Sequence, residues 1–263
     1  MPRLCPLFSG SSGNSYYIGS AERGVLIDAG RSAKQICDAL TANGLDIRNV
    51  EAIFVTHEHI DHAKGLRVLA KKYHLRVYAT EGTIEALAEK ELIDGSTDIV
   101  PITRAGAEAG GLTVVPFRIS HDCREGVGYR AASSDGRSTA FVTDTGCISD
   151  EIRAAVTGCD TVVLESNHDE GMLRCGSYPY ILKRRILSDI GHLSNDVCAQ
   201  TAVELVRSGT TRLILAHLSR ENNYPQLALQ TSLCAFEMNG MKQNLDFMLS
   251  VAPVENKAGA ILY

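Results

Sequence analysis

The sequence predicts one α/β domain in which polar residues follow the ends of buried strands. Short apolar runs alternate along the chain with segments that carry the apolar period of an amphipathic helix. Several apolar runs are followed within a residue or two by His or Asp, namely 53–55, 114–119, 140–143 and 213–216. The length of 263 residues allows one large or two small domains. The absence of a repeat, a low-complexity tract or a linker favours one domain over residues 1–263.

The first half of the chain predicts alternating strands and helices. A Gly-containing turn separates the first two strands, Asn43-Gly44 closes the first helix, and apolar residues at i, i+3, i+4 and i+7 mark the second. In order, these elements are strands at 16–18 and 24–30, a helix at 32–40, a strand at 52–55, a helix at 66–73, a strand at 75–79 and a helix at 83–90.

The second half predicts more strands and one long helix. An Asp135-Gly136 hairpin signal separates two of the strands, and Gly209 stops the helix. The expected elements are strands at 111–117, 127–132, 139–143 and 161–164, a helix at 196–207, a strand at 212–216, and a closing strand pair at 247–251 and 260–263.

Composition is ordinary for a globular protein, with 44% hydrophobic and 22% charged residues. No apolar run approaches the roughly 20 residues of a membrane span, and the proline-broken N-terminus is unlike a secretory signal, so we expect a cytoplasmic protein with no membrane partner. The net charge of −5 argues against a uniformly basic nucleic-acid binder but leaves a local basic face open. The eight cysteines include no C-x-x-C pair, which indicates neither a cysteine zinc cluster nor a disulfide framework.

Four potential metal ligands, His57, His59, Asp61 and His62, directly follow the strand at 52–55. Because side chains alternate along a strand, His57 and His59 can project to the same side and share a cation. We expect Asp61 at the N-cap of the following helix, which turns it and His62 back toward the strand end, where they can complete a second cation site. Such nitrogen and oxygen donors suit Zn, Mn or Fe. The alternative is a solvated loop that happens to be rich in His.

Converging strand ends would add distant residues to this cluster. His121, Asp144 and His217 each follow an apolar run. Together with the four local residues they supply enough nitrogen donors and carboxylates for two metal ions, with Asp144 suited to bridge them. Asp28, which ends an earlier strand, is interpreted either as a partner that orients a ligand histidine from behind or as a turn residue before Gly30.

These residues, in this order, resemble the metallo-β-lactamase superfamily, whose pattern is a strand-ending Asp, H-x-H-x-D-H, a lone His, a lone Asp and a final His. The resemblance implies a four-layered αβ/βα sandwich of two mixed β-sheets flanked by helices, with metals at one edge. Asp144 stands where many true β-lactamases carry Cys. In this respect the chain is similar to the dinuclear hydrolase branch.

Further segments narrow the resemblance. The segments 191–195 and 215–220 are similar to the end of ribonuclease Z. The segments 8–15, 165–169, 191–195 and 217–223 resemble the bacterial YycJ/WalJ group over about residues 4 to 225. That resemblance implies a metal-dependent 5′-to-3′ exonuclease with DNA, rather than RNA, as its substrate.

The expected chemistry uses two divalent metal ions (Zn, Mn or Fe) about 3.5–4 Å apart, which neutralise the scissile phosphate and generate hydroxide at neutral pH. One ion is expected at His57, His59 and His121, and the other at Asp61, His62 and His217, with Asp144 between them. Asp61 is also a candidate acceptor of the water proton. His192, matched to the ribonuclease Z segment, is the candidate proton donor to the leaving oxygen; its alternative is a turn histidine before a helix cap.

The candidate substrate-binding residues surround these ligands in the sequence. The helix start at Ser194 and Asn195 could bind a phosphate through free N–H groups. Ser219 and Arg220 could contact the phosphate backbone, or lie in an exposed loop. For His168, phosphate contact and structural support both remain open. The basic run 183–185 near Tyr178 and Tyr180 is either a solvated helix face or a nucleic-acid track, and His74 is expected to have no function.

The sequence therefore supports a dinuclear metal phosphodiesterase, with a DNA exonuclease favoured. A glyoxalase-II-like thioester hydrolase would use the same ligands without needing His192. A metal-bound scaffold or nucleic-acid binder without turnover is a third hypothesis.

Overall fold

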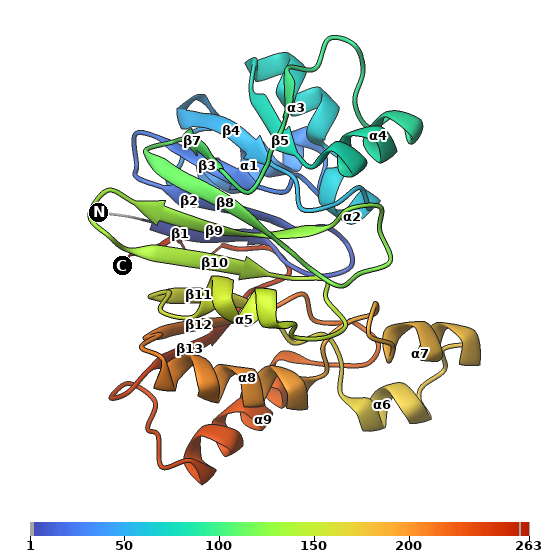
Figure 1. Ribbon diagram of the computed structural model, residues 1–263, viewed down its shortest axis with the longest axis vertical. Coiled ribbons are helices and arrows are strands. Elements are labelled where there is room, and N and C mark those ends of the chain that lie inside the picture. Colours follow the sequence, from blue (N-terminus) through green and yellow to red (C-terminus); the bar gives the residue numbers. More distant parts are fainter. Residues whose placement is uncertain (1–2, 258, 263) are drawn as a thin grey trace.

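The computed structural model describes residues 3–257 and 259–262. Two seven-stranded sheets pack face to face, and helices cover their outer faces (Figure 1). Among the described residues, no helix combines the length and apolarity needed to cross a bilayer.

The first sheet has the strand order β14-β1-β2-β3-β4-β5-β6. Strands β3 to β6 run parallel, whereas β14, β1, β2 and β3 pair antiparallel. Parallel neighbours need crossover connections, which the intervening helices supply. The strands are β1 Arg3–Phe8, β2 Ser15–Gly19, β3 Gly24–Ile27, β4 Val50–Phe54, β5 Arg76–Ala79, β6 Ile99–Pro101 and β14 Ile261–Leu262. The helices are α1 Ala33–Ala42, the 3₁₀ turn η1 Ile47–Asn49, α2 Ile60–Ala63, α3 Leu66–Tyr73 and α4 Glu81–Glu89.

The second sheet has the order β13-β12-β11-β10-β9-β8-β7, with β10 to β13 parallel and the rest antiparallel. Its strands are β7 Ala107–Ala109, β8 Leu112–Arg118, β9 Val127–Ser133, β10 Ser138–Val142, β11 Thr161–Glu165, β12 Arg212–Ala216 and β13 Met248–Val251. Its helices are α5 Asp150–Val156, α6 Glu170–Cys175, α7 Tyr180–Ile186, α8 Asn195–Arg207 and α9 Pro225–Met238. Helices α6 and α7 project from one side of the sandwich (Figure 1).

Three apolar clusters hold the layers together. Between the sheets, the Phe54 ring of β4 lies edge-on to Tyr129 of β9 at 5.5 Å, and Tyr16 of β2 lies 5.7 Å from Phe141 of β10. The outer clusters join α1 and α3 to the first sheet and α5, α8 and α9 to the second. This helix–sheet–sheet–helix order confirms the expected four-layered sandwich.

The prediction that the last two strands pair with each other was wrong. Strand β13 joins the second sheet beside β12, whereas β14 joins the first sheet beside β1; residue 263 lies outside the described residues. The two segments are close in sequence and similarly apolar, but each completes the open edge of a different sheet.

Candidate active site

Three polar residues that shape the site sit just past strand ends in a left-handed backbone conformation. Asp28 follows β3 with φ of 63°, Asp144 follows β10 with φ of 58°, and His217 follows β12 with φ of 54°. Non-glycine residues rarely adopt this conformation, and it persists only where the surroundings enforce it. The chain thus turns sharply at each strand end and aims these side chains across the edge of the sandwich.

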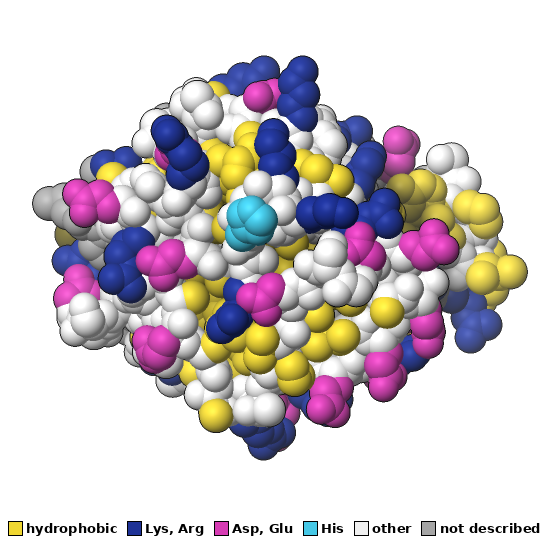
Figure 2. Space-filling view, turned by 90° about the horizontal axis from the view of Figure 1, so that it is seen from above, with side chains coloured by type: hydrophobic (Ala, Val, Ile, Leu, Met, Phe, Trp, Pro, Cys, Tyr) yellow, Lys and Arg dark blue, Asp and Glu magenta, His cyan; other side chains and the backbone are white. Residues whose placement is uncertain are grey.

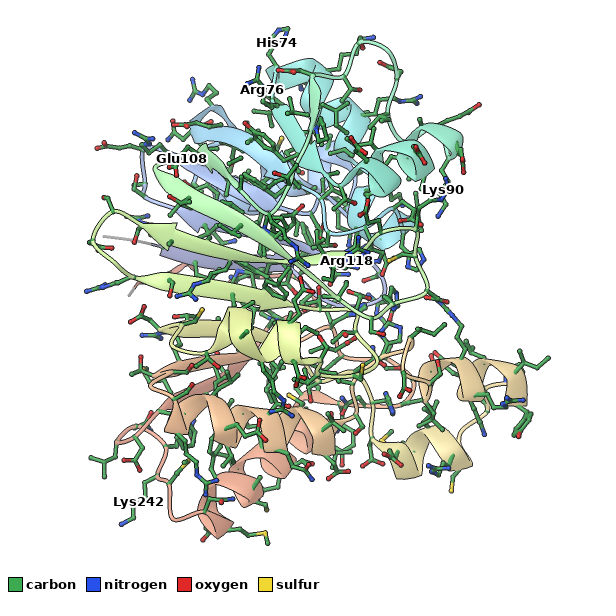
Figure 3. All side chains as sticks on the ribbon, viewed as in Figure 1. His74, Arg76, Lys90, Glu108, Arg118 and Lys242 are labelled. Atoms are coloured by element: carbon green, nitrogen blue, oxygen red, sulfur yellow. The ribbon has the colours of Figure 1, made fainter. Side chains whose placement is uncertain are left out.

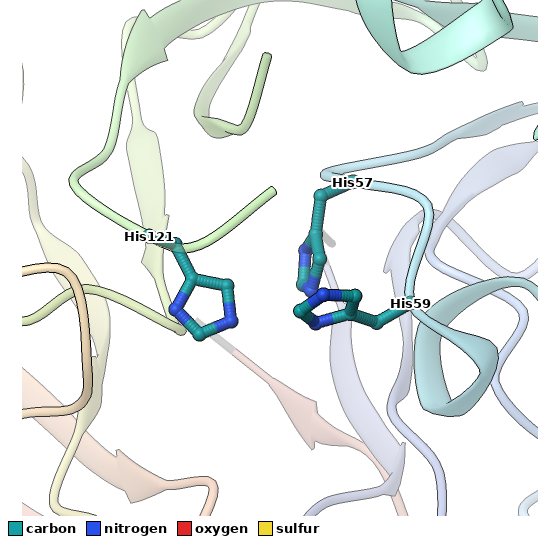
Figure 4. Close-up of side chains that lie close together, drawn as sticks. All are labelled: His57, His59 and His121. Atoms are coloured by element: carbon teal, nitrogen blue, oxygen red, sulfur yellow. The ribbon is translucent and has the colours of Figure 1, made fainter. Parts of the chain in front are cut away.

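Three histidines converge from two loops (Figure 4). His57 and His59 lie between β4 and α2, and His121 lies between β8 and β9. One ring nitrogen from each falls within 4.8 Å of the other two. This is the first of the ligand sets predicted from sequence.

A second group contains Asp61, His62 and His217, which also offer ligand atoms within 4.8 Å of one another. Asp61 Oδ2 lies 3.7 Å from the Nε2 atoms of both His62 and His217. Asp144 lies between the two groups, with Oδ2 3.2 Å from His62 Nε2 and Oδ1 3.9 Å from His121 Nε2. All seven predicted metal ligands therefore meet at one place.

The expectation that Asp61 is an N-cap was wrong. His59 occupies the N-cap position of the short helix α2, Asp61 lies in its first turn, and α3 begins separately after Gly65. The extra turn brings Asp61 to the cluster without any capping bond.

Four of the histidines share one arrangement, in which Nδ1 contacts an outer partner and Nε2 lies on the side of the centre. His62 Nδ1 donates to Asp28 Oδ2 at 2.8 Å, and His121 Nδ1 donates to the Gly191 carbonyl at 3.0 Å. His57 Nδ1 lies 3.0 Å from the Thr56 hydroxyl. His217 Nδ1 lies 3.1 Å from Glu165 Oε1 and also 3.0 Å from Asp144 Oδ1. Such outer partners select the tautomer of a ligating histidine.

Asp28 was interpreted from the sequence either as a turn residue or as a partner of a ligand histidine, and its contacts fit both interpretations. It forms the turn after β3, and its fully buried carboxylate accepts from His62 and, at 2.8 Å, from the Thr56 backbone N–H. It therefore orients His62 from behind.

Two buried nitrogens at the centre, His57 Nε2 and His217 Nε2, have no hydrogen-bond partner. Leaving such an atom unpaired costs about 1–3 kcal/mol, and neutral imidazole nitrogen is a good ligand for a transition metal. Burial, assisted by the charge of His62, holds the pKa of His57 well below its usual range, which keeps its ring neutral.

The electrostatics of the centre also favour cations. Burial lowers the pKa of His62 and His217, but Asp144 and the other surrounding carboxylates outweigh it and raise both values well above the usual range. A proton is thus bound strongly where a metal ion could take its place. The buried His and Asp clusters are consistent with a dinuclear metal site.

Glu165, the last residue of β11, is a site residue to which the sequence analysis gave no role. Oε1 accepts from His192 Nδ1 at 2.8 Å and lies 3.1 Å from His217 Nδ1, while Oε2 accepts from the backbone N–H groups of Thr145 and Leu193. Burial raises the pKa of this carboxyl, but His192 and His217 outweigh it and bring the pKa to about 2. The signal that could have found Glu165 is its place at a strand end, which it shares with Asp28.

The contact with Glu165 explains the position of His192. Its ring centroid lies 5.0 Å from that of His121 and 5.4 Å from that of His217. Its side chain is 15% exposed, so it is part of the site and still reaches the surface. With Nδ1 held by Glu165, Nε2 is the ring atom that can carry a proton toward a substrate.

A cavity of about 270 Å³ opens on these groups. It is lined by His59, Asp61, His121, Asp144, His192 and His217, and by Ser11, Asn167, Tyr178, Leu182, Arg185, Ile186 and Ser219. Ser219 thus reaches the cavity as predicted for a substrate contact, whereas Arg220 is exposed beside it.

Other candidate substrate residues are engaged within the protein. Ser194 caps α8 by accepting from the Val197 N–H, and Asn195 Oδ1 accepts from the Ser166 hydroxyl at 2.7 Å. His168 is 1% exposed, with both ring nitrogens unpartnered, and it is not among the residues lining the cavity. At the helix start, the Asn195 N–H donates to the His168 carbonyl at 2.8 Å. Phosphate binding by N–H groups at this helix start, and phosphate contact by His168, remain predictions.

The basic run in α7 is also largely engaged. Lys183 Nζ donates to the carbonyls of Arg174 and Gly176, Arg185 is paired with Asp122, and Arg184 lies over the ring of Tyr180.

Two views show polar side chains on other parts of the molecule. His74 lies at the tip of α3, distant from α7 (Figure 3). On the face seen in Figure 2, basic and acidic side chains are interspersed. That face therefore offers no broad basic surface.

Comparisons with known proteins agree with this site. A family model described as the beta-lactamase superfamily domain matches residues 23–218. The solved structure of the metallo-beta-lactamase fold protein YhfI from Bacillus subtilis superposes with a TM-score of 0.73 at 16% identity, covering 97% of this chain and 98% of that one. The chain belongs to the metallo-β-lactamase superfamily, and it is a metal-dependent hydrolase.

Two curated relatives are similar over most of their length. Exodeoxyribonuclease YycJ of Bacillus anthracis is 42% identical, with 89% of each chain covered. Exodeoxyribonuclease WalJ of Streptococcus pneumoniae is 37% identical, with 92% of this chain and 90% of the relative covered. Within the superfamily, this chain belongs to the family of YycJ and WalJ.

Proposed function

We propose that this protein is a metal-dependent DNA exonuclease that degrades its substrate in the 5′-to-3′ direction. The observation that carries the proposal is the pairing of two ligand sets across Asp144 with a histidine, His192, held beside them by Glu165. The names of the two relatives, both exodeoxyribonucleases, support DNA as the substrate.

The donor sets fit two divalent ions, because the first offers three imidazole nitrogens and the second offers two imidazole nitrogens and a carboxylate, within 4.8 Å of one another in each set. His57, His59 and His121 would hold one ion, Asp61, His62 and His217 the other, and Asp144 would bridge them. When bound, such a pair neutralises the phosphate and acidifies water.

The protein's own residues then handle the protons. The Asp61 side chain is 22% exposed and lines the cavity, so its carboxylate can accept the proton of the attacking water. His192 donates a proton from Nε2 to the leaving oxygen. Glu165 holds the His192 ring in the required orientation through the hydrogen bond from Nδ1.

The test is hydrolysis of single- and double-stranded DNA labelled at either the 5′ or the 3′ end, with Mn, Mg or Zn supplied. Early release of labelled mononucleotide from the 5′-labelled strand is expected, and none after chelation or with His59→Ala. His74→Ala, which removes an exposed histidine far from the cavity, is the matched control. Early release from the 3′ label refutes the direction, and hydrolysis of acyl-glutathione without any DNA cleavage refutes the nuclease.

A further inference from the structure

Two arginines from distant parts of the chain meet at one serine beside the cavity. The hydroxyl of Ser12 accepts from a terminal nitrogen of Arg31 at 2.8 Å and from one of Arg220 at 2.7 Å. The two guanidinium groups are therefore held close together around a single neutral acceptor.

Within residues 3–257 and 259–262, no carboxylate lies within ion-pair distance of either guanidinium, whereas Arg185, for example, is paired with Asp122. Like charges so close together repel each other. An anion that contacts both would relieve this repulsion.

An independent observation points to a missing acceptor. Arg31 Nε is buried and has no hydrogen-bond partner, although buried donors in folded proteins are nearly always paired. The guanidinium is also fixed in place, since it lies over the Phe8 ring at 5.3 Å from the centroid. A Cβ at Gly13 would come within 2.7 Å of Arg31 Cδ, so the glycine allows this close approach.

The position of this pair relates it to the proposed chemistry. Ser11, adjacent to Ser12, lines the cavity, and so does Ser219, adjacent to Arg220. The same loop contacts the metal centre, because Asn14 Nδ2 lies 3.0 Å from His62 Nε2. The cluster of Ser12, Arg31 and Arg220 is thus joined through its chain neighbours Ser11 and Ser219 to the wall of the cavity.

We propose that Arg31 and Arg220 form a clamp for a backbone phosphate of the DNA strand next to the scissile phosphate, an inference that rests on the proposed function. Guanidinium groups match phosphate with forked, charge-assisted hydrogen bonds. Ser12 holds the two forks together when no phosphate is present. Such contacts carry no sequence information, which suits an enzyme that removes every nucleotide in turn.

The test is DNA binding without turnover. Fluorescence anisotropy on the metal-loaded protein, with labelled single-stranded DNA whose phosphorothioate linkages resist hydrolysis and over a range of salt concentrations, would compare Arg31→Gln, Arg220→Gln and the double variant with the wild type. Arg207→Gln is the matched control, because it removes the same charge elsewhere. Arg207 is the last residue of α8, a 13-residue helix about 20 Å long whose first residue, Asn195, follows His192 of the site.

Each clamp variant is expected to bind DNA several-fold more weakly. The plot of log K against log salt should become less steep, by about 0.7 per lost phosphate contact. Arg220→Lys should keep the salt slope and recover part of the affinity, because it keeps the charge but loses the fork. KM for DNA should increase in the clamp variants by a larger factor than kcat decreases, because the clamp contacts a phosphate next to the scissile one.

The outcomes separate the two proposals. Wild-type DNA degradation together with clamp variants that bind like Arg207→Gln overturns the clamp alone. A wild type that neither binds nor cleaves DNA overturns both proposals. Arg220 is exposed, so its substitution carries the test even if Arg31→Gln impairs folding, which thermal melting would reveal.

Discussion

Replacing Glu165 with Gln should reduce kcat about 100-fold. The carboxylate accepts from four N–H groups, two of them on the rings of His192 and His217. A glutamine offers one oxygen and turns an NH₂ group toward the remaining donors, so it cannot satisfy all four.

The magnitude follows from the pKa of the carboxyl. Its decrease from 4.5 to about 2 corresponds to about 3 kcal/mol in favour of the charged form. Because Glu165 Oε1 positions the His192 ring for proton donation, losing most of that interaction in the variant, about 3 kcal/mol, corresponds to roughly two powers of ten in rate.

The assay is steady-state hydrolysis of DNA, with the bound metal measured in parallel because Glu165 also contacts His217. Glu58→Gln is the matched control. Glu58 is also buried, but it contacts the Arg124 backbone N–H rather than a histidine, and its Oε2 has no hydrogen-bond partner. A folded, metal-loaded Glu165→Gln enzyme with wild-type kcat would refute the reasoning.

Three further predictions concern single residues. His192→Ala should lower kcat for DNA by about 10²–10³ without loss of metal, and a p-nitrophenyl ester, whose leaving group needs no proton, should be hydrolysed normally; equal losses on both substrates would contradict a proton-donor role. Asp28→Asn should weaken metal affinity about 10- to 100-fold, measured by competition with a chelating dye, and unchanged affinity would mean that Asp28 only shapes the turn. Burial lowers the pKa of His168 from 6.5 to about 4, so the unfolded chain binds more protons between these values and stability should rise with pH across that window. At pH 5 this amounts to a loss of about 2 kcal/mol relative to pH 8, which His168→Gln should remove in urea denaturation curves; an identical pH dependence in the variant would show that His168 is not the group responsible.

Local patterns identified many elements and the first ligands, because their geometry depends on neighbours in the chain. The apolar stripe of α3 and the capping residue Ser32 of α1 are visible as spacings. Helix α9 was not predicted, although Pro225 marks its first turn, because its buried face includes Ser232 between Ala228 and Phe236 and so lacks a continuous apolar stripe. Strand β1 was missed because it contains Pro6 and is buried almost throughout, which removes the alternation typical of a half-buried strand.

By itself, the sequence determined the family, the fold class and the set of residues that could bind metal, since H-x-H-x-D-H and strand-ending acids are local features. Only the tertiary structure decided which acid supports which histidine and which arginines share a serine. Glu165 contacts His192 and His217, and Arg31 meets Arg220, across separations of 27, 52 and 189 residues. Contacts over such separations depend on the strand order and register of two packed sheets, which no local period encodes.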